Sequence, residues 1–207
     1  MSYASIAFSE AAKKIQEKAG SRASYARMEK QDLTDSLTGN EVEFISQRDG
    51  FYMATVGKNG FPYIQFRGGP KGFLKVLDDR RLGFIDFRGN MQYISVGNLS
   101  TNNKVALFLM DYTTKTRLKI YAEAEVVEVK DNASLFNQLN LADYQFKPER
   151  MLVLSVKAYN WNCPQHIIPR FTLDEIKQVF EEQQEHIAQL EAEIKALKAA
   201  SSLKSII

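Results

Sequence analysis

Short runs of apolar and β-branched residues, separated by turn residues, dominate the middle of the chain. Four of these runs occupy residues 51–56, 61–66, 73–77 and 82–87. The first two flank Asn59-Gly60, which is the strongest short-range signal for a β-hairpin, and the last two flank a polar turn at residues 78–81. The pattern predicts antiparallel strands that follow one another as a meander.

Further strands are predicted nearer the C-terminus. Residues 104–110 are almost wholly apolar, residues 118–126 alternate strictly between apolar and polar side chains, and residues 151–157 form a last apolar run. Six or seven strands with closely spaced turns are typical of an antiparallel barrel or sandwich. We therefore predict a mainly β protein, a β-barrel with helices packed on it.

Two helix signals precede the strands. Ser9 is a favourable N-cap for a helix over residues 10–19, and Thr38 with Glu41 forms a capping box that opens a second, short helix. Residues 21–27 lie between them and show no clean period. That segment is expected to be an ordered loop or a short helix.

Other helices are predicted between the strands. Asn90 is suited to cap a helix over residues 91–96 that stops at Gly97, and another helix is expected over residues 132–141. Residues 159–171 contain two prolines and many hydrogen-bonding side chains. This segment is predicted to be a loop.

The C-terminal segment carries a heptad pattern. Thr172 and Glu175 form a capping box, after which apolar residues recur at alternating spacings of three and four, with Gln183 as the single polar exception. The seam comprises Leu173, Ile176, Phe180, Gln183, Ile187, Leu190, Ile194 and Leu197. It predicts a coiled coil with another chain or a long helix laid along a partner, the alternative being a helix packed on its own barrel.

Composition places the chain among ordinary globular proteins. Of its 207 residues 44% are hydrophobic and 25% charged, and 27 Lys and Arg residues against 25 Asp and Glu residues leave a formal charge of +2. This balance argues against nucleic acid as a partner. No apolar run approaches the roughly 18 residues of a membrane span, and no secretion signal is evident, so we expect no membrane association and a cytoplasmic location.

Few residues are suited to protein-based catalysis. A single Cys163 cannot form an internal disulfide, and His166, three residues away in a proline-bent loop, is not a convincing base for it. Two histidines and one cysteine are too few for a zinc site, and no carboxylates have metal-ligand spacing. We predict neither a metal centre nor a catalytic constellation of side chains.

Glycines and cations recur among the strand-like runs of residues 59–92, a pattern suited to holding an anion against backbone N–H groups. The run Arg67-Gly68-Gly69-Pro70-Lys71-Gly72 fits neither the dinucleotide nor the P-loop pattern, and alone it indicates a bulged β-corner equally well. In context the chain resembles the pyridoxamine-5′-phosphate-oxidase-like, FMN-binding split-barrel proteins, in the branch with RGGP-x-GFL and NCPQHI signatures. The segments that carry the resemblance are 62–75, 83–95, 107–112 and 162–167.

The resemblance implies an architecture and an activity. It implies a six-stranded antiparallel FMN-binding split barrel, which we place over residues 49–171. The helix signals add a helical segment over 1–48, expected to pack on the barrel, and the heptad helix over 172–207. The resemblance also implies a homodimer with FMN in the groove between the subunits and a small-molecule electron donor or acceptor. The expected activity is that of an FMN-dependent oxidoreductase, with no particular substrate indicated.

The resemblance assigns roles to several residues. Lys75 matches a strand lysine beside the flavin, Ile85 and Asp86 match the next strand's backbone contact to the cofactor, and Arg117 falls near a polar residue under the flavin. In the second subunit, Trp161, Gln165 and His166 are expected to form the opposite wall of the groove. Trp161 could instead fill a seam between barrel and helix, and the other two could satisfy the backbone of their own loop.

This chain departs from the family's phosphate site. The arginine and lysine expected at the helix start correspond to Met91 and Gln92, of which Gln92 is retained as a cofactor contact. A bidentate arginine and a helix N-terminus can together meet the charge of a phosphate. The local candidates for this role are Arg67, Lys71, Arg88 and the N–H groups around Asn90.

Other interpretations of the sequence stay open. The protein could be a non-catalytic flavin-, deazaflavin- or haem-binding module whose C-terminal helix mediates dimer or partner contacts, or a purely structural dimer. At the level of single residues, Arg67 and Lys75 could be charges at the barrel rim. Arg88 could form a surface ion pair with Asp86 or Asp111.

Overall fold

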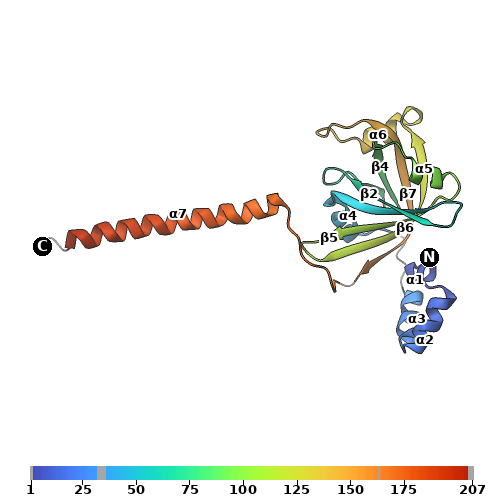
Figure 1. Cartoon of the computed structure of the whole chain (residues 1–207), viewed down its shortest axis with the longest axis horizontal. Coiled ribbons are helices and arrows are strands. Elements are labelled where there is room, and N and C mark those ends of the chain that lie inside the picture. Colours follow the sequence, from blue (N-terminus) through green and yellow to red (C-terminus); the bar gives the residue numbers. More distant parts are fainter. Residues whose placement is uncertain (1, 32–35, 163, 205–207) are drawn as a thin grey trace. The chain divides into compact units, whose positions relative to one another are not determined.

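The computed structural model describes residues 2–31, 36–162 and 164–204, and the chain divides into two compact units (Figure 1). The first unit comprises Met1–Asp111 and Lys115–His166. The second comprises Tyr112–Thr114 and Ile167–Ile207 and contains the long helix α7, Leu173–Lys204. Cys163 lies outside the described residues.

Within the described residues, the first unit is built on one seven-stranded antiparallel sheet of order β2-β1-β5-β6-β7-β4-β3. The mainly β, antiparallel fold class is therefore confirmed. The pattern of apolar runs predicted six or seven strands, whereas the split barrel implied by the resemblance has six; the described residues form seven, with the four-residue β3 paired to β4 at one edge of the sheet. The strands are β1 Gly50–Val56, β2 Pro62–Gly68, β3 Lys75–Asp78, β4 Arg81–Phe87, β5 Lys104–Asp111, β6 Thr116–Glu128 and β7 Pro148–Asn162.

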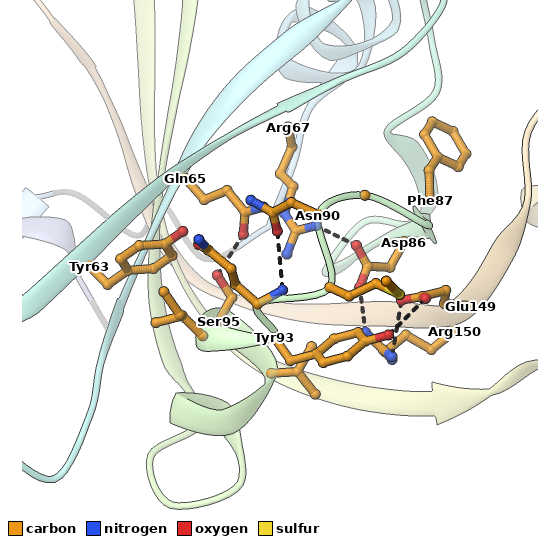
Figure 2. Close-up of a pocket in the computed structure, with 15 residues that line it drawn as sticks. Tyr63, Gln65, Arg67, Asp86, Phe87, Asn90, Tyr93, Ser95, Glu149 and Arg150 are labelled. Carbon is orange, nitrogen blue, oxygen red and sulfur yellow. Dashed lines mark hydrogen bonds and ion pairs between the residues drawn. The ribbon is translucent and has the colours of Figure 1, made fainter.

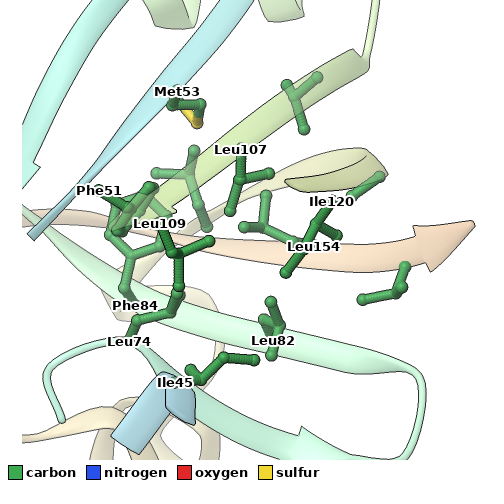
Figure 3. Close-up of a cluster of buried hydrophobic side chains, with 14 of the residues drawn as sticks. Ile45, Phe51, Met53, Leu74, Leu82, Phe84, Leu107, Leu109, Ile120 and Leu154 are labelled. Carbon is green, nitrogen blue, oxygen red and sulfur yellow. The ribbon is translucent and has the colours of Figure 1, made fainter. Parts of the chain in front are cut away.

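The larger of two hydrophobic clusters in the described residues lies inside the curled sheet (Figure 3). The alternation predicted for β6 is confirmed, because Leu118 and Ile120 are buried while Lys119 faces outward and is only partly covered. Phe51 of β1 packs edge-on against Phe84 of β4, with ring centroids 5.4 Å apart, although three strands separate β1 from β4 in the sheet order. The sheet must therefore curl until its two ends face each other across the core.

Short helices form where the capping signals placed them. Ser9 accepts a hydrogen bond from the Ala12 amide at the start of α2, and Thr38 and Glu41 form the predicted capping box at the start of α4. Residues 22–31 form a helix, which settles the ambiguity over 21–27. The helices of this unit are α1 Tyr3–Ala7, α2 Glu10–Lys18, α3 Arg22–Gln31, α4 Gly39–Ser46, α5 Ile94–Leu99 and α6 Ala133–Leu139, with a 3-10 turn at Val129–Asp131.

Two predicted elements differ from the structure. The helix expected over residues 91–96 is instead α5, which begins at Ile94 and continues through Gly97. Met91 has φ 60° and Tyr93 has φ 54°, and residues in the left-handed region cannot belong to a right-handed helix. Residues 159–162, expected to begin a loop, instead belong to β7, because that strand continues its pairing with β6 as far as Asn162.

Glu41 joins α4 to the end of β7. Its side chain is buried, with 3% of the residue exposed, and it accepts hydrogen bonds from the Thr38 amide at 2.9 Å and the Thr38 hydroxyl at 2.6 Å. Trp161 of β7 donates its indole N–H to the same carboxylate at 2.6 Å. The Trp161 ring also packs edge-on against Phe44, with centroids 4.9 Å apart. One carboxylate therefore serves both as a helix cap and as an anchor for the sheet.

Candidate functional site

A pocket opens where the edge strand β2 approaches the ends of β4 and β7 (Figure 2). Three side chains of β2 that share one face line it, namely Tyr63, Gln65 and Arg67. The segment between β4 and α5 forms another wall. The empty volume of the pocket is about 580 Å³, including solvent at its open side. The pocket is therefore an open hollow that side chains of β2, β4 and β7 surround.

A charged trio forms the floor of the pocket. Asp86 of β4 is 5% exposed and accepts hydrogen bonds from Arg67 of β2 and, at 2.9 Å, from Arg150 of β7. Arg150 also pairs with Glu149 at 3.2 Å. Because β2 and β4 are not neighbours in the sheet, the Arg67–Asp86 ion pair links two strands that share no described backbone pairing. The pocket therefore lies where a side-chain ion pair, rather than backbone pairing, joins β2 to β4.

The register of β4 and β7 explains how this trio assembles. Asp86 lies directly opposite Arg150, whereas the next residue of β4, Phe87, lies opposite Pro148. Glu149 is therefore the extra residue of a β-bulge, a feature that often re-aims side chains beside functional sites. The bulge allows consecutive residues, Glu149 and Arg150, both to line the same pocket.

One atom of the trio lacks a hydrogen-bond partner. The Nε of Arg67 is buried and has no acceptor among the described residues, although the Nη1 of the same guanidinium donates to Asp86. The Arg67 side chain is 11% exposed, and its guanidinium carbon lies 5.8 Å from the centre of the Phe84 ring. An unsatisfied buried donor costs about 1–3 kcal/mol. An acceptor bound in the pocket would remove that penalty.

The remaining walls are a mixture of polar and apolar groups. Ser95, buried at the start of α5, donates to the side-chain oxygen of Gln65 at 2.9 Å. Tyr93 donates to Glu149 at 3.0 Å, and its ring lies 5.0 Å from the Arg150 guanidinium carbon. These contacts hold α5, β2 and β7 around the same space. Strained backbone conformations tend to persist at functional sites, and the left-handed Met91 and Tyr93 both line this pocket.

A second hollow adjoins the first on the other side of Arg67. It has an empty volume of about 500 Å³ and is lined by four phenylalanines together with Arg67 and Arg88. Arg88 lies at its rim, with half of its side chain exposed, 3.9 Å from a Glu149 oxygen and 3.3 Å from the Met91 sulfur. The phenylalanines are Phe66, Phe73, Phe84 and Phe87. Arg67 and Asp86 are thus shared between a mixed pocket and an aromatic one.

Sequence comparison decides the family. The family model described as pyridoxamine 5′-phosphate oxidase matches residues 37–160, which is more than half of the chain and contains every residue that lines the pocket. The chain belongs to the pyridoxamine 5′-phosphate oxidase family. This confirms the resemblance seen in the sequence. A search of the curated proteins gave no significant match.

Solved structures resembling this family member include a candidate pyridoxamine 5′-phosphate oxidase of Lactobacillus delbrueckii. It is 25% identical, with a TM-score of 0.48 over 62% of this chain and 96% of the other. An FMN-binding protein of Syntrophomonas wolfei is 13% identical, with a TM-score of 0.48 over 71% of this chain and 97% of the other. HupZ of Group A Streptococcus is 16% identical, with a TM-score of 0.46 over 65% of this chain and 99% of the other.

The structure brings together some of the predicted site residues of this pyridoxamine 5′-phosphate oxidase family member. Arg67, Asp86, Asn90 and Gln92 line the pocket itself. Ile85 and Arg88 line the adjoining aromatic hollow. Other predicted residues lie outside both linings in the single chain, and these are Lys71, Lys75, Arg117, Trp161, Gln165 and His166.

Expectations about two individual residues, Arg88 and Asn90, need correction. Arg88 pairs with neither Asp86 nor Asp111 in the described contacts but lies near Glu149; Asp111 is paired with Arg48 at 2.9 Å. Asn90 caps no helix, because its side-chain oxygen accepts from the Gln92 amide at 3.1 Å within the turn that precedes α5. Neither of these contacts was evident from the sequence.

Several pocket residues were missed by reasoning from sequence. Tyr63 and Gln65 carried a usable signal, because alternation along a strand puts them on the same face as Arg67. Glu149 and Arg150 carried none, since their place depends on the register between β4 and β7. Tyr93 and Ser95 were assigned to the interior of a helix, and the turn at residues 90–93 gives them different orientations.

Metal sites and membrane-spanning helices are two further features that bear on function. Among the described residues, no group of three or more His, Cys, Asp and Glu side chains is placed to hold a metal ion. None of the helices in the described part of the chain is long and apolar enough to cross a membrane.

Proposed function

We propose that this protein binds FMN in the pocket between β2, β4 and α5 and acts as a flavin-dependent oxidoreductase. Membership of the pyridoxamine 5′-phosphate oxidase family supports the proposal. The observation that carries it is the buried, unpaired Nε–H of Arg67 in that pocket. A phosphate or ring oxygen of FMN would provide the acceptor that the described protein groups do not.

The donor groups around the pocket suit one end of FMN in particular. Arg67, Arg88 and Arg150 lie in or beside it, and only two carboxylates, Asp86 and Glu149, oppose them. This leaves a small positive excess, which favours an anion. We assign the phosphate to Arg67 and Arg88, assisted by the side-chain amides of Asn90 and Gln92. These amides compensate for the absence of the family's arginine and lysine at Met91 and Gln92.

The remaining walls suit a flat heteroaromatic ring. Gln65 and Ser95 offer hydrogen-bonding groups, whereas Met91, Ile94 and Val96 offer apolar surface. Bound flavin would supply hydride and electron transfer, and the protein would hold, orient and polarise it. Because the flavin supplies the redox chemistry, the absence of a catalytic constellation among the described side chains is compatible with an enzyme.

We also propose that the groove is completed by a second subunit. The outer face of β2 carries Ile64, which is 64% exposed, and Phe66, which is 58% exposed. Phe66 lies opposite the exposed Tyr52 of β1, and Tyr52 lies opposite Phe108 of β5, so an apolar strip crosses three strands. Contiguous exposed apolar surface is typical of protein interfaces. A partner on this face could bring Lys75, Arg117 or the 161–166 segment to the cofactor.

Replacing Arg67 with lysine is expected to weaken FMN binding about tenfold to hundredfold, since a hydrogen bond to a charged group contributes about 1.5–3 kcal/mol. Lysine keeps the positive charge but cannot reproduce the guanidinium fork. Titration of purified apoprotein with FMN, followed by flavin fluorescence, measures the change. The same titration with riboflavin, which lacks the phosphate, should show a much smaller difference between wild type and variant.

A matched control is Arg81→Lys, because Arg81 also pairs with an aspartate, Asp78 at 2.6 Å, but is half exposed at the start of β4 and does not line the pocket. Its FMN affinity should equal that of the wild type. If Arg67→Lys lost the same amount of affinity for FMN and for riboflavin, Arg67 would contact the flavin ring rather than the phosphate. Wild-type protein that neither purifies yellow nor binds added FMN would refute the proposed function.

Catalysis is tested separately from binding. Anaerobic addition of NADH or NADPH to the FMN-loaded protein is expected to bleach the flavin absorption within the time of manual mixing. The matched comparison is free FMN at the same concentration. Stable flavin absorption with both nucleotides, in protein that binds FMN tightly, would instead favour the non-catalytic carrier.

A further inference from the structure

Helix α7 exposes a line of large apolar side chains that Gln183 interrupts. It spans 32 residues, and its seam residues range from 38% exposed at Ile176 to 78% at Leu173. Leu190, near the middle, is 44% exposed, and Leu197 is 69% exposed. A helix in a protein gains most of its stability by packing its apolar stripe against another surface, so this line of side chains requires a partner surface.

We propose that α7 forms a parallel, in-register, two-stranded coiled coil with α7 of a second copy of this chain. The seam follows the heptad spacing of three and four residues from Leu173 to Leu197. The a positions are Leu173, Phe180, Ile187 and Ile194, and the d positions are Ile176, Gln183, Leu190 and Leu197.

The choice of residues at the seam favours two strands. The C-terminal half has Ile187 and Ile194 at a positions and Leu190 and Leu197 at d positions. β-Branched residues at a with leucine at d favour parallel dimers over higher oligomers. In a parallel dimer each a residue packs against an a residue of the partner and each d residue against a d residue. The partner that best supplies isoleucine at a and leucine at d is therefore the same segment of a second copy.

Gln183 sets the direction and the register. In a parallel, in-register pair, Gln183 meets Gln183 of the other chain, and the two amides can hydrogen-bond to each other. In the antiparallel arrangement that keeps the same seam, Gln183 would lie against Ile187 of the other chain. A buried amide without a partner is costly. A single Asn or Lys at an a position specifies register in coiled coils, and we assign the corresponding role to Gln183 at its d position.

The flanking positions agree with this arrangement. Glu181, Glu182 and Glu185 occupy b, c and f positions, which point away from the partner helix and stay in water. His186 occupies a g position, and Glu191 occupies the e position that it would approach on the other chain. The outward charges also discourage further helices from joining the pair.

The start of the helix is defined independently of any partner. Thr172 and Glu175 form the capping box that the sequence predicts, with the Thr172 amide donating to Glu175 at 2.7 Å. Thr113 also donates to the backbone oxygen of Arg170 at 3.1 Å. Because α7 lies outside the residues matched by the family model, this inference does not rest on the proposed FMN site.

The test is disulfide cross-linking in the full-length protein. Cys163→Ser removes the natural cysteine, and Leu190→Cys then places a single thiol at a d position. In the proposed dimer the two thiols face each other within the range that a disulfide bridges. Mild oxidation should convert nearly all of the protein to a covalent dimer that dithiothreitol reverses. The matched control, Glu185→Cys in the same background, places its thiol at an outer f position and should cross-link much more slowly.

Alternative arrangements give distinct results. In the antiparallel pair, Leu190 lies opposite Phe180, so efficient cross-linking only in a mixture of the Leu190→Cys and Phe180→Cys proteins would overturn the proposed direction. In a trimer, about one third of the thiols would stay free after complete oxidation, because three cysteines can form only one disulfide. Equal, slow cross-linking at positions 185 and 190 would show that α7 does not pair with its own copy.

Discussion

Replacing Asp86 with alanine is expected to lower the free energy of unfolding by about 3–5 kcal/mol, the cost of removing one partner from a buried ion pair. Asp86 is 5% exposed and lies between the guanidinium groups of Arg67 and Arg150. Those side chains are only 11% and 14% exposed. Without the carboxylate, Arg67 loses its described ion-pair partner and Arg150 keeps only Glu149.

Urea denaturation at neutral pH measures this loss. The matched control is Asp78→Ala, which also removes an aspartate paired with an arginine. In that pair the Arg81 side chain is 56% exposed, and the two residues flank the turn between β3 and β4. Exposed pairs contribute about 0–1 kcal/mol, so the control should stay close to wild type. A loss below about 1 kcal/mol in Asp86→Ala would mean that the two arginines are not held by this carboxylate.

The same pair of variants separates structure from binding. If the FMN phosphate occupies the pocket, added FMN should restore part of the stability of Asp86→Ala. The phosphate dianion can pair with Arg67 and Arg150, which lose the carboxylate between them in this variant. Added FMN should shift the unfolding of Asp78→Ala by the same amount as that of the wild type. Restoration by inorganic phosphate as well would indicate that the charge of the ligand, rather than the flavin ring, is responsible.

The strands were predictable because their signal is local. Alternation identified the inner face of β6, and Asn59-Gly60 identified the hairpin between β1 and β2. The same alternation put Tyr63, Gln65 and Arg67 on one face, and that face lines the pocket. Properties that repeat every two residues can be derived without knowledge of which strands become neighbours.

The charged floor of the pocket was not predictable in the same way. The Asp86–Arg150 contact joins residues 64 positions apart and depends on a bulge at Glu149. No pattern within either strand specifies that register. The prediction of a helix from residue 91 failed for a different reason. Asn90 suits both a helix cap and a turn in which its side-chain oxygen accepts a hydrogen bond from the Gln92 amide. The left-handed backbone of Met91 is compatible only with the turn.

Trp161 shows how a plausible cofactor contact can have a structural partner. The sequence left open whether its ring stacks on flavin or fills a seam, and in the structure its N–H donates to Glu41 while its ring packs on Phe44. The residue is still 36% exposed, so one part of the ring is available to another molecule. Glu41 therefore determines where this predicted site residue lies.

Replacing Glu41 with alanine is expected to cost about 3–4 kcal/mol, because the helix loses its cap and several hydrogen bonds to a charged group at once. Glu41→Gln should cost less but still destabilise the protein. Its amide keeps one accepting oxygen, whereas its NH₂ group would face the donors of Thr38 or Trp161. The matched control is Glu43→Gln, since Glu43 lies exposed on the same helix. Denaturant midpoints at neutral pH measure all three variants.

The dependence of this difference on pH follows from the pKa of Glu41. Burial is the largest influence and alone would raise the pKa, but the hydrogen bonds from Thr38, Trp161 and Tyr159 together outweigh it and lower the pKa below its ordinary value. A carboxylate with a lowered pKa in the folded state stabilises the protein fully above the ordinary glutamate pKa of about 4.3, and that contribution is lost as the pH falls through the lowered value.

The stability difference between wild type and Glu41→Gln should therefore be largest near pH 7 and shrink once the pH falls below about 4.3, because glutamine does not titrate. Indole fluorescence of Trp161, the single tryptophan, reports on the same contact. Its emission should shift in Glu41→Gln at pH 7 and stay unchanged in Glu43→Gln. A stability difference that stays constant down to pH 3 would mean that packing around Glu41, rather than its charge, holds α4 against β7.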